Sequence, residues 1–291
     1  MRITRRKSCA GILGSLTVVP GAAAPLVIDT HIHLFDPQRF SYHANAVYRP
    51  AAYTLEDYTR FVKAVNIAHT ILVHPEPYQD DHRYLEYCFQ HEPRPGFFKG
   101  TCLYDPISPD TPARIKAAAD RIVALRIHVT EPARYPSRGG PIRDRDLSSA
   151  EMRQTWKAVA DRGIAVQLHL IPKFAAAVYN LAAQFRATPV LIDHMARAAQ
   201  GTPEEFVDVL RLARLPRTYI KFSGPGFDLR RDWVRRAFDA FGAKRILWGG
   251  LGHSPADYAK ATAKFDEAFA FASERDRELI RGGNAAKLFR F

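Results

Sequence analysis

Histidines are the residues of this sequence whose type and spacing point most directly to chemistry. Of the eleven histidines, seven fall at or just past the end of a β-rich run. They are His31, His33, His74, His128, His169, His194 and His253. Imidazole binds divalent metal ions and exchanges protons near neutral pH. Because these histidines recur at the ends of successive strands, the sequence predicts one site at which they meet.

His31, His33 and His169 are the predicted metal ligands. His31 and His33 are two residues apart, so on an extended strand their side chains leave the same face. Three neutral imidazoles and a water form an open tetrahedral site that suits zinc, or a related ion such as manganese. Such an ion would polarise a carbonyl and activate its water for ester, lactone or amide hydrolysis. The alternative is that these histidines bind substrate or one another without any metal.

The remaining polar residues of the predicted rim are assigned to proton transfer and to substrate binding. His194 follows Asp193, which could orient it, and is predicted to do acid/base work. Arg126 shares strand parity with His128, so we expect it to point inward and bind a substrate carboxylate, or else to pair with a carboxylate of the interior. The predicted substrate-binding residues are Arg126, His128, His74 and Tyr78. Taken alone, His74, His128 or His253 could equally be a hydrogen-bonded structural residue.

Eight β-rich runs alternate with amphipathic stretches after residue 25, which is the pattern of parallel βα units. The predicted strands are Leu26–Thr30, Ala68–His74, Gly96–Tyr104, Ile122–Val129, Ile164–Leu170, Val190–Asp193, Thr218–Phe222 and Arg245–Gly249. Between them lie helical stretches such as Glu151–Arg162, Phe174–Phe185, Pro203–Ala213 and Asp232–Phe241. This order predicts a single-domain α/β protein, a (β/α)8 TIM barrel with its chemistry at the carboxyl ends of the strands. An open doubly wound sheet is the alternative, but no glycine-rich turn follows the first strand.

The composition indicates a globular protein with a basic surface. Hydrophobic residues make up 47% and charged residues 25%, and the formal net charge is +12. The cluster Arg230, Arg231, Arg235 and Arg236 has helical spacing and is interpreted as a solvated helix face, with no nucleic-acid motif beside it. The excess of cations favours a small acidic substrate instead.

Residues 1–24 have the anatomy of an export signal. They carry the pair Arg5-Arg6, an apolar stretch from Cys9 to Val19 that is too short to anchor the chain in a bilayer, and a small-residue end. The paired arginines predict twin-arginine export to the periplasm or the medium, and a cytoplasmic protein if the signal does not function. Residues 25–291 then form the catalytic domain. Its two cysteines, Cys88 and Cys102, are too few for a disulfide framework.

Several motifs together resemble the amidohydrolase superfamily, in particular the amidohydrolase-2 group that contains 2-pyrone-4,6-dicarboxylate lactonase. They are Ile28-Asp29-Thr30-His31-Ile32-His33-Leu34-Phe35-Asp36-Pro37, Leu72-Val73-His74-Pro75-Glu76-Pro77-Tyr78, Val190-Leu191-Ile192-Asp193-His194-Met195-Ala196-Arg197, Lys221-Phe222-Ser223-Gly224-Pro225, Arg245-Ile246-Leu247-Trp248-Gly249 and Asn284-Ala285-Ala286-Lys287-Leu288-Phe289. The resemblance implies a distorted barrel that hydrolyses, or sometimes decarboxylates, a small acid. In metal-using relatives the first-strand pair, a fifth-strand histidine and an eighth-strand aspartate bind the ion, and His31, His33 and His169 match the first three. The lactonase branch works without metal, and there the fifth-strand histidine tends to be absent.

The eighth strand departs from the family pattern. Relatives read Trp-Gly-Ser-Asp, whereas this chain reads Trp248-Gly249-Gly250-Leu251, with leucine in place of the aspartate that takes a proton from the attacking water. Asp257 is interpreted as a helix cap, so His253 or His194 would have to act as the base. We therefore expect a hydrolase of a small anionic lactone or ester. The alternatives are a catalytically impaired barrel that binds a small molecule as a sensor or scavenger, and a decarboxylase. The segment Glu131–Ser149 is either a lid over the site or a solvated insert.

Overall fold

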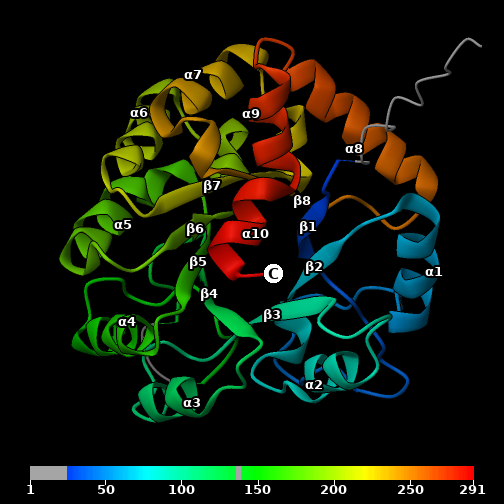
Figure 1. The fold of residues 1–291 in the computed structure, drawn as a ribbon. Helices are drawn as coiled ribbons and strands as arrows, with labels where there is room; N and C mark the ends of the chain where they lie inside the picture. The colour runs from blue at the N-terminus through cyan, green and yellow to red at the C-terminus, as the bar shows by residue number, and fades with distance from the viewer. Residues whose placement is uncertain (1–24, 136–138) are drawn as a thin grey trace, which may run out of the picture.

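The computed structural model describes residues 25–135 and 139–291, and its centre is a ring of eight parallel strands (Figure 1). Each strand pairs with the next in chain order. They are β1 (Ile28–Ile32), β2 (His69–Val73), β3 (Phe98–Cys102), β4 (Ile122–Val129), β5 (Ala165–Leu170), β6 (Val190–Ile192), β7 (Thr218–Ser223) and β8 (Ile246–Gly249). Where the ring meets itself, Thr30 Oγ1 of β1 donates a hydrogen bond to the Trp248 carbonyl of β8 at 2.7 Å. The predicted single-domain (β/α)8 barrel is confirmed.

The seam between β1 and β8 depends on a glycine. A Cβ placed on Gly249 would lie 2.7 Å from the backbone nitrogen of His31 and 2.7 Å from Thr30 Oγ1. Any side chain there would push β1 away from β8. The close approach keeps the first-strand histidine next to the end of the last strand.

Helices surround the ring and are defined by caps that the sequence supplies. Ser149 accepts a hydrogen bond from the Met152 N–H at the start of α4, and Thr202 and Glu205 form a capping box at the start of α6. The helices are α1 (Leu55–Val65), α2 (Arg83–Gln90), α3 (Thr111–Ala117), α4 (Ala150–Arg162), α5 (Ala175–Ala182), α6 (Pro203–Arg211), α7 (Arg231–Phe241), α8 (Pro255–Ala268), α9 (Glu274–Glu278) and α10 (Asn284–Phe289).

The last helix closes the amino-terminal end of the barrel. Ala285 and Phe289 of α10 are buried against small and aliphatic side chains, among them Ile28, Ile71, Val73, Ala124, Ala165, Leu191 and Leu247. Figure 1 shows α10 lying across the centre of the ring. The centre of this end is covered by α10, and in this fold the substrate binds at the opposite end, at the carboxyl termini of the strands.

The observed strands differ from the predicted ones by at most two residues at each end. The largest differences are in β1, which is shifted from Leu26–Thr30 to Ile28–Ile32, and in β3, which is shorter than Gly96–Tyr104. The ladder with β2 begins at Ile28, opposite His69, and Leu26 is exposed. His31 therefore belongs to the first strand rather than following it.

Three further sequence predictions concern the compartment of the protein. Cys88 and Cys102 are buried free thiols. Among the residues placed by the structure, no helix combines the length and apolar character needed to cross a membrane. The predicted export signal, residues 1–24, lies outside the described residues.

Candidate functional site

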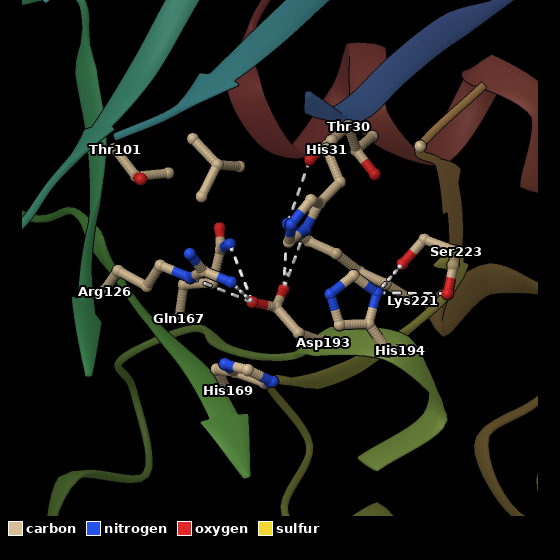
Figure 2. Close-up of polar contacts among 12 residues, drawn as sticks. Thr30, His31, Thr101, Arg126, Gln167, His169, Asp193, His194, Lys221 and Ser223 are labelled. Carbon is tan, nitrogen blue, oxygen red and sulfur yellow. Dashed lines mark hydrogen bonds and ion pairs between the residues drawn. The ribbon is translucent and has the colours of Figure 1, made fainter. Parts of the chain in front are cut away.

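A buried carboxylate, Asp193, lies at the centre of the polar residues at the carboxyl ends of the strands (Figure 2). Its Oδ2 accepts hydrogen bonds from Gln167 Nε2 at 3.1 Å and from Arg126 Nε at 3.3 Å. Its Oδ1 lies 3.4 Å from Lys221 Nζ and 3.3 Å from His31 Nδ1. These partners come from β1, β4, β5 and β7, so the carboxylate ties together strands that are distant in sequence.

The charges around Asp193 do not cancel. Burial alone would raise the pKa of Asp193, but His31, Lys221 and Arg126 hold it well below its usual range. Burial lowers the pKa of Lys221 to about 8, although Asp193 opposes this shift. At neutral pH one carboxylate therefore faces two cations, Lys221 and Arg126, and this part of the barrel carries net positive charge.

The hydrogen bonds of two histidines fix which nitrogen carries the proton. His194 Nδ1 lies 3.0 Å from the Ser223 carbonyl, and His33 Nδ1 lies 2.7 Å from the Val73 carbonyl. A carbonyl can only accept, so in each ring Nδ1 donates and Nε2 keeps its lone pair. Burial lowers the pKa of His194 to about 4 and that of His33 to about 3, which leaves both rings neutral at neutral pH. Each offers one basic nitrogen to the site.

A left-handed turn after β6 places His194 and Arg197. The φ angles of His194, Met195, Ala196 and Arg197 lie between 49° and 56°. This conformation costs an L-residue about 1–2 kcal/mol, and none of the four is glycine. The turn brings Arg197 Nη1 to 3.0 Å from His169 Nε2, which accepts because a guanidinium can only donate. Backbone strain of this kind commonly persists at functional sites, where the surrounding structure holds it in place.

A cavity of about 590 Å³ opens above these residues. Its lining includes Arg126, Arg143, Arg197, His33, His128, His169, His194, Tyr48, Glu76, Thr130 and Glu131. Arg143 is paired with Asp144 at 2.9 Å, whereas Arg197 donates to the ring of His169, which burial keeps neutral. The cavity is therefore complementary in charge to a small anion.

A larger cavity of about 850 Å³ lies at the other end of the barrel, beside α10. It is lined by residues that precede strands, such as Arg217 and Arg245, and by the helix itself. Chemistry in this fold is placed at the carboxyl ends of strands, so the smaller cavity is the candidate active site.

One group of residues could hold a metal ion. Within residues 25–135 and 139–291, His31, Asp193 and His194 form the one group of three possible ligands whose ligand atoms all lie within 4.8 Å of one another. The predicted ligands His33 and His169 are not part of it. His33 Nε2 nevertheless lies 3.3 Å from His31 Nε2.

The proton count at His31 tests whether a cation fits. Burial lowers the pKa of His31 well below its usual value, so the ring is neutral and has one N–H. That single N–H has two neighbouring acceptors, Asp193 Oδ1 and His33 Nε2, each 3.3 Å away. The His31 nitrogen that carries no proton therefore faces the second acceptor, lone pair against lone pair. A bound cation or an additional proton would remove this repulsion. The donor set thus fits a divalent ion, while Lys221 and Arg126 oppose further positive charge at the same carboxylate.

The predicted substrate-binding residues divide into two pairs. Arg126 and His128 line the cavity. His74 and Tyr78 are buried outside it: His74 Nε2 donates to the Gln79 carbonyl at 2.9 Å, and the Tyr78 hydroxyl accepts from the Asp36 N–H at 2.7 Å. Both side chains already have partners within the fold, so their contacts are those of structural residues.

The structure does not bring His253 to the cavity. Its ring is exposed and stacks on Tyr53, with 3.9 Å between the ring centroids. It lines a separate cavity of about 460 Å³ together with Asp257. Asp257 Oδ2 accepts from Ser254 Oγ at 2.8 Å at the start of α8, which is the capping role predicted for it.

The end of β8 offers no carboxylate to the site. Leu251 is buried, and its N–H donates to Asp29 Oδ2 at 3.3 Å. Asp29 Oδ1 also accepts from the backbone N–H groups of His31 and Gly250 at 3.0 and 2.8 Å. These hydrogen bonds join the carboxylate of β1 to the backbone at the end of β8, so the role of Asp29 is structural.

The segment between β4 and α4 packs against the barrel in the part that the structure describes. Asp144 Oδ1 accepts from the Thr130 N–H at 2.7 Å, and Arg145 pairs with Asp105 at 2.6 Å. The Ile142 N–H donates to Gln79 Oε1 at 2.6 Å, and Arg143 lines the cavity. Glu131 and Arg143 thus contribute to one wall of the site, while residues 131–134 and 139–140 of the segment are exposed to solvent.

Several residues of the site were given no role from the sequence, although Glu76, Arg197 and Lys221 lie within the motifs that resemble the family. Lys221 contacts Asp193, and Arg197 contacts His169. Tyr48 and Glu76 line the cavity. The lysine could have been found, because it lies between the apolar residues Ile220 and Phe222 of a predicted strand. Tyr48 carries no comparable signal.

Comparison with known proteins identifies the family and the fold. The family model for amidohydrolases matches residues 28–291. A probable 2-pyrone-4,6-dicarboxylic acid hydrolase from Acinetobacter baumannii, with citric acid bound, has a TM-score of 0.72 at 20% identity over 91% of this chain and 99% of that one. An amidohydrolase from Burkholderia multivorans with bound zinc has a TM-score of 0.72 at 16% identity over 91% and 99%. No curated protein matches the sequence.

A decarboxylase shares the same fold. A dihydroxybenzoic acid decarboxylase from Polaromonas, with bound manganese and the inhibitor 2-nitroresorcinol, has a TM-score of 0.65 at 16% identity over 92% of this chain and 97% of that one. At such identities the likeness of the structures establishes the fold alone. The family model spans the whole described barrel, and on that basis the chain belongs to the amidohydrolase family.

Proposed function

We propose that this amidohydrolase hydrolyses a small lactone or ester that carries a carboxylate. The observation that carries the proposal is the combination, in one cavity at the strand ends, of three arginines with the unprotonated Nε2 of His194. Arg126 shares its carboxylate with Lys221, and the charge of Arg197 faces a neutral ring. A substrate carboxylate would complete this charge balance, and guanidinium groups bind it with two parallel hydrogen bonds.

The chain's own groups can supply the proton transfer. His194 is oriented by Ser223, is neutral at neutral pH and can accept a proton from a water that attacks the substrate carbonyl carbon. The arginines would stabilise the negative charge that develops on the carbonyl oxygen. A base and preorganised cations are the two elements that hydrolysis of an activated carbonyl requires.

Metal assistance is the second scheme for the same reaction, and the group His31, Asp193 and His194 supports it. An ion held there would polarise the substrate carbonyl and acidify a water. It would use the same His194 nitrogen, so His194 cannot be both ligand and base. The two cations beside Asp193 favour the scheme without metal.

Two other functions remain as alternatives. Decarboxylation of a related acid is supported by the decarboxylase with the same fold. A binding protein that acts as a sensor or scavenger is supported by Leu251, which stands where relatives carry an aspartate. Both alternatives share the anion-binding cavity and differ in what happens to the bound acid.

The test is turnover of paired substrates by matched variants. We expect wild-type protein to hydrolyse lactones and esters that carry a carboxylate in preference to uncharged analogues. His194→Asn should reduce kcat by roughly 10²- to 10⁴-fold, the usual range for loss of a general base. His253→Asn, outside the cavity, should retain activity. Equal activity of the His194 variant, or loss only in the His253 variant, would contradict the proposal.

We also propose that residues 1–24 direct export, on the strength of Arg5-Arg6 and the apolar stretch that follows. Fractionation of cells that express the full chain should find the protein in the periplasm or medium. Replacement of both arginines by lysine should retain it in the cytoplasm. An unchanged distribution would contradict twin-arginine export.

A further inference from the structure

Glu76 is a buried carboxylic acid in the wall of the cavity that the reaction proposed above does not use. It lies in the 3-10 turn Glu76–Tyr78 that directly follows β2, and its side chain is 0% exposed although it lines the cavity. Its Oε1 accepts a hydrogen bond from Gln79 Nε2 at 2.6 Å. Its Oε2 makes no hydrogen bond of ordinary geometry among the described residues, although the Val47 N–H approaches the carboxyl group. Buried polar atoms are rarely left without a partner, so this oxygen, itself buried at the cavity wall, could take one from a bound molecule that comes within reach of it.

The carboxyl group is held in place from several sides. Gln79 Nε2 also donates to the Glu76 carbonyl at 2.8 Å, and Gln79 Oε1 accepts from the Ile142 N–H at 2.6 Å. His74 Nε2 fixes the Gln79 carbonyl at 2.9 Å. This network gives Glu76 one orientation and explains why His74 is buried just outside the cavity.

The charged and titratable groups that face Glu76 come from three segments. Tyr48 approaches from the segment after β1, Arg143 from the segment before α4, and Arg126 from β4 on the same cavity wall. No salt bridge to Glu76 is formed within the described part of the chain. Burial raises the pKa of Glu76, and the Val47 N–H, Arg143 and Gln79 only partly oppose the shift. A carboxyl group in such surroundings holds its proton at higher pH than an exposed one.

Glu76 and the proposed base lie on opposite sides of the barrel. Glu76 follows β2 and His194 follows β6, and these strands are four positions apart in a ring of eight. Both side chains line the same cavity. A substrate carbonyl in this cavity would therefore have a proton acceptor on one side and a carboxylic acid on the other, which is the arrangement used for general acid–base catalysis.

We infer that Glu76 is the general acid of the reaction, which donates its proton through Oε2 to the leaving oxygen of the substrate. This inference rests on the proposed hydrolysis. Water oxygen bonds to the carbonyl carbon, and one water proton passes to the base. The bond from that carbon to the leaving oxygen breaks as this oxygen takes the proton of Glu76. The products are a carboxylic acid and an alcohol, and the proton on the base returns to the Glu76 carboxylate through solvent.

The test compares substrates whose leaving groups need acid assistance to different degrees. Aliphatic lactones and alkyl esters expel a strongly basic oxygen, whereas p-nitrophenyl esters expel a weakly basic one. We expect Glu76→Gln to lower kcat/KM by roughly 10²- to 10⁴-fold for the first class and by less than about 10-fold for the second. The variant should also lose the decline of kcat/KM on the alkaline side. Glu267→Gln, an exposed residue of α8, is the matched control and should behave as wild type.

The outcomes separate this inference from the proposed function. If wild-type protein hydrolyses neither class, the proposed hydrolysis fails and the role of Glu76 fails with it. If wild-type protein is active but Glu76→Gln loses both classes equally, or loses neither, Glu76 is a structural acid and only this inference is overturned. Should Glu76→Gln not fold, Glu76→Asp keeps a carboxyl group. The Glu76→Asp variant must then still hydrolyse substrates with a basic leaving group. If it loses these substrates but hydrolyses p-nitrophenyl esters at the wild-type rate, the inference is contradicted.

Discussion

Replacement of Asp193 by asparagine should destabilise the barrel strongly, because the carboxylate is the shared partner of two buried cations. Lys221 Nζ and Arg126 Nη2 lie 3.4 and 3.3 Å from its oxygens, and all three side chains are at most 3% exposed. At 3.4 Å, and with an effective dielectric constant of about 20, the attraction between Lys221 and Asp193 is about 5 kcal/mol before desolvation is subtracted. Removing one partner of a buried pair typically costs about 3–5 kcal/mol, since it leaves the other charge uncompensated.

The assay is urea unfolding followed by circular dichroism, with a double-mutant cycle. Asp193→Asn should lower the free energy of unfolding by about 3–5 kcal/mol. Adding Lys221→Met removes one of the uncompensated cations. The loss of unfolding free energy in the double variant should therefore be about 1–3 kcal/mol smaller than the sum of the two single losses. Asp239→Asn, which breaks an exposed pair with Arg235, should cost less than about 1 kcal/mol. Additive effects, or an Asp193 variant as stable as the control, would refute the shared-partner argument.

Three further predictions concern stability and binding. His82 should make the protein acid-sensitive: its Nε2 accepts from the Leu103 N–H, and burial lowers its pKa to about 4. The unfolded chain then binds more protons than the folded one between about pH 6.5 and pH 4, so stability falls as the pH falls through this window, by at most about 3 kcal/mol. His82→Gln should flatten the dependence of the urea midpoint on pH there, and an unchanged slope would contradict the assignment. Gly249→Ala should reduce the free energy of unfolding by about 1–3 kcal/mol and so lower Tm, because the new methyl group would clash with His31 and Thr30. An unchanged Tm would show that β1 and β8 can separate without cost. Arg197→Met should weaken the binding of a tricarboxylate such as citrate by roughly 10- to 100-fold in calorimetry, the value of a charged hydrogen bond, while Arg235→Met on α7 should not change it. Equal binding by both arginine variants would remove Arg197 from the anion site.

The fold and the meeting of His31, His33, His128, His169 and His194 could be predicted because they depend on periodic patterns, whereas the same reasoning wrongly added His74 and His253. Aliphatic runs such as Ile71-Leu72-Val73 are typical of strands buried on both faces, and eight of them with intervening helices leave few possible topologies. The spacing of His31 and His33 fixes their common face in any extended strand. These features are local, so the sequence alone contains them.

The chemistry of the cavity depends on contacts that no local pattern records. The left-handed turn from His194 to Arg197 contains neither glycine nor asparagine, so nothing in its residue types predicts positive φ angles. Because of this turn, Arg197 donates a hydrogen bond to His169, which the sequence predicts to be a metal ligand. Glu76 becomes unusual only when the 3-10 turn after β2 buries it beside Gln79. Leu251, by contrast, stands in the sequence where the family resemblance predicts an aspartate. The nearby carboxylate of Asp29 accepts hydrogen bonds from the backbone of Gly250 and Leu251, just after β8.

The most direct test of the account is to follow a carboxylate-bearing lactone with the purified protein in water enriched in ¹⁸O. We predict ring opening that depends on the protein, with one ¹⁸O atom in the new carboxyl group, no release of carbon dioxide, and loss of turnover in His194→Asn. Recovery of unchanged lactone from a tight complex, or release of carbon dioxide without ¹⁸O in the product, would contradict it.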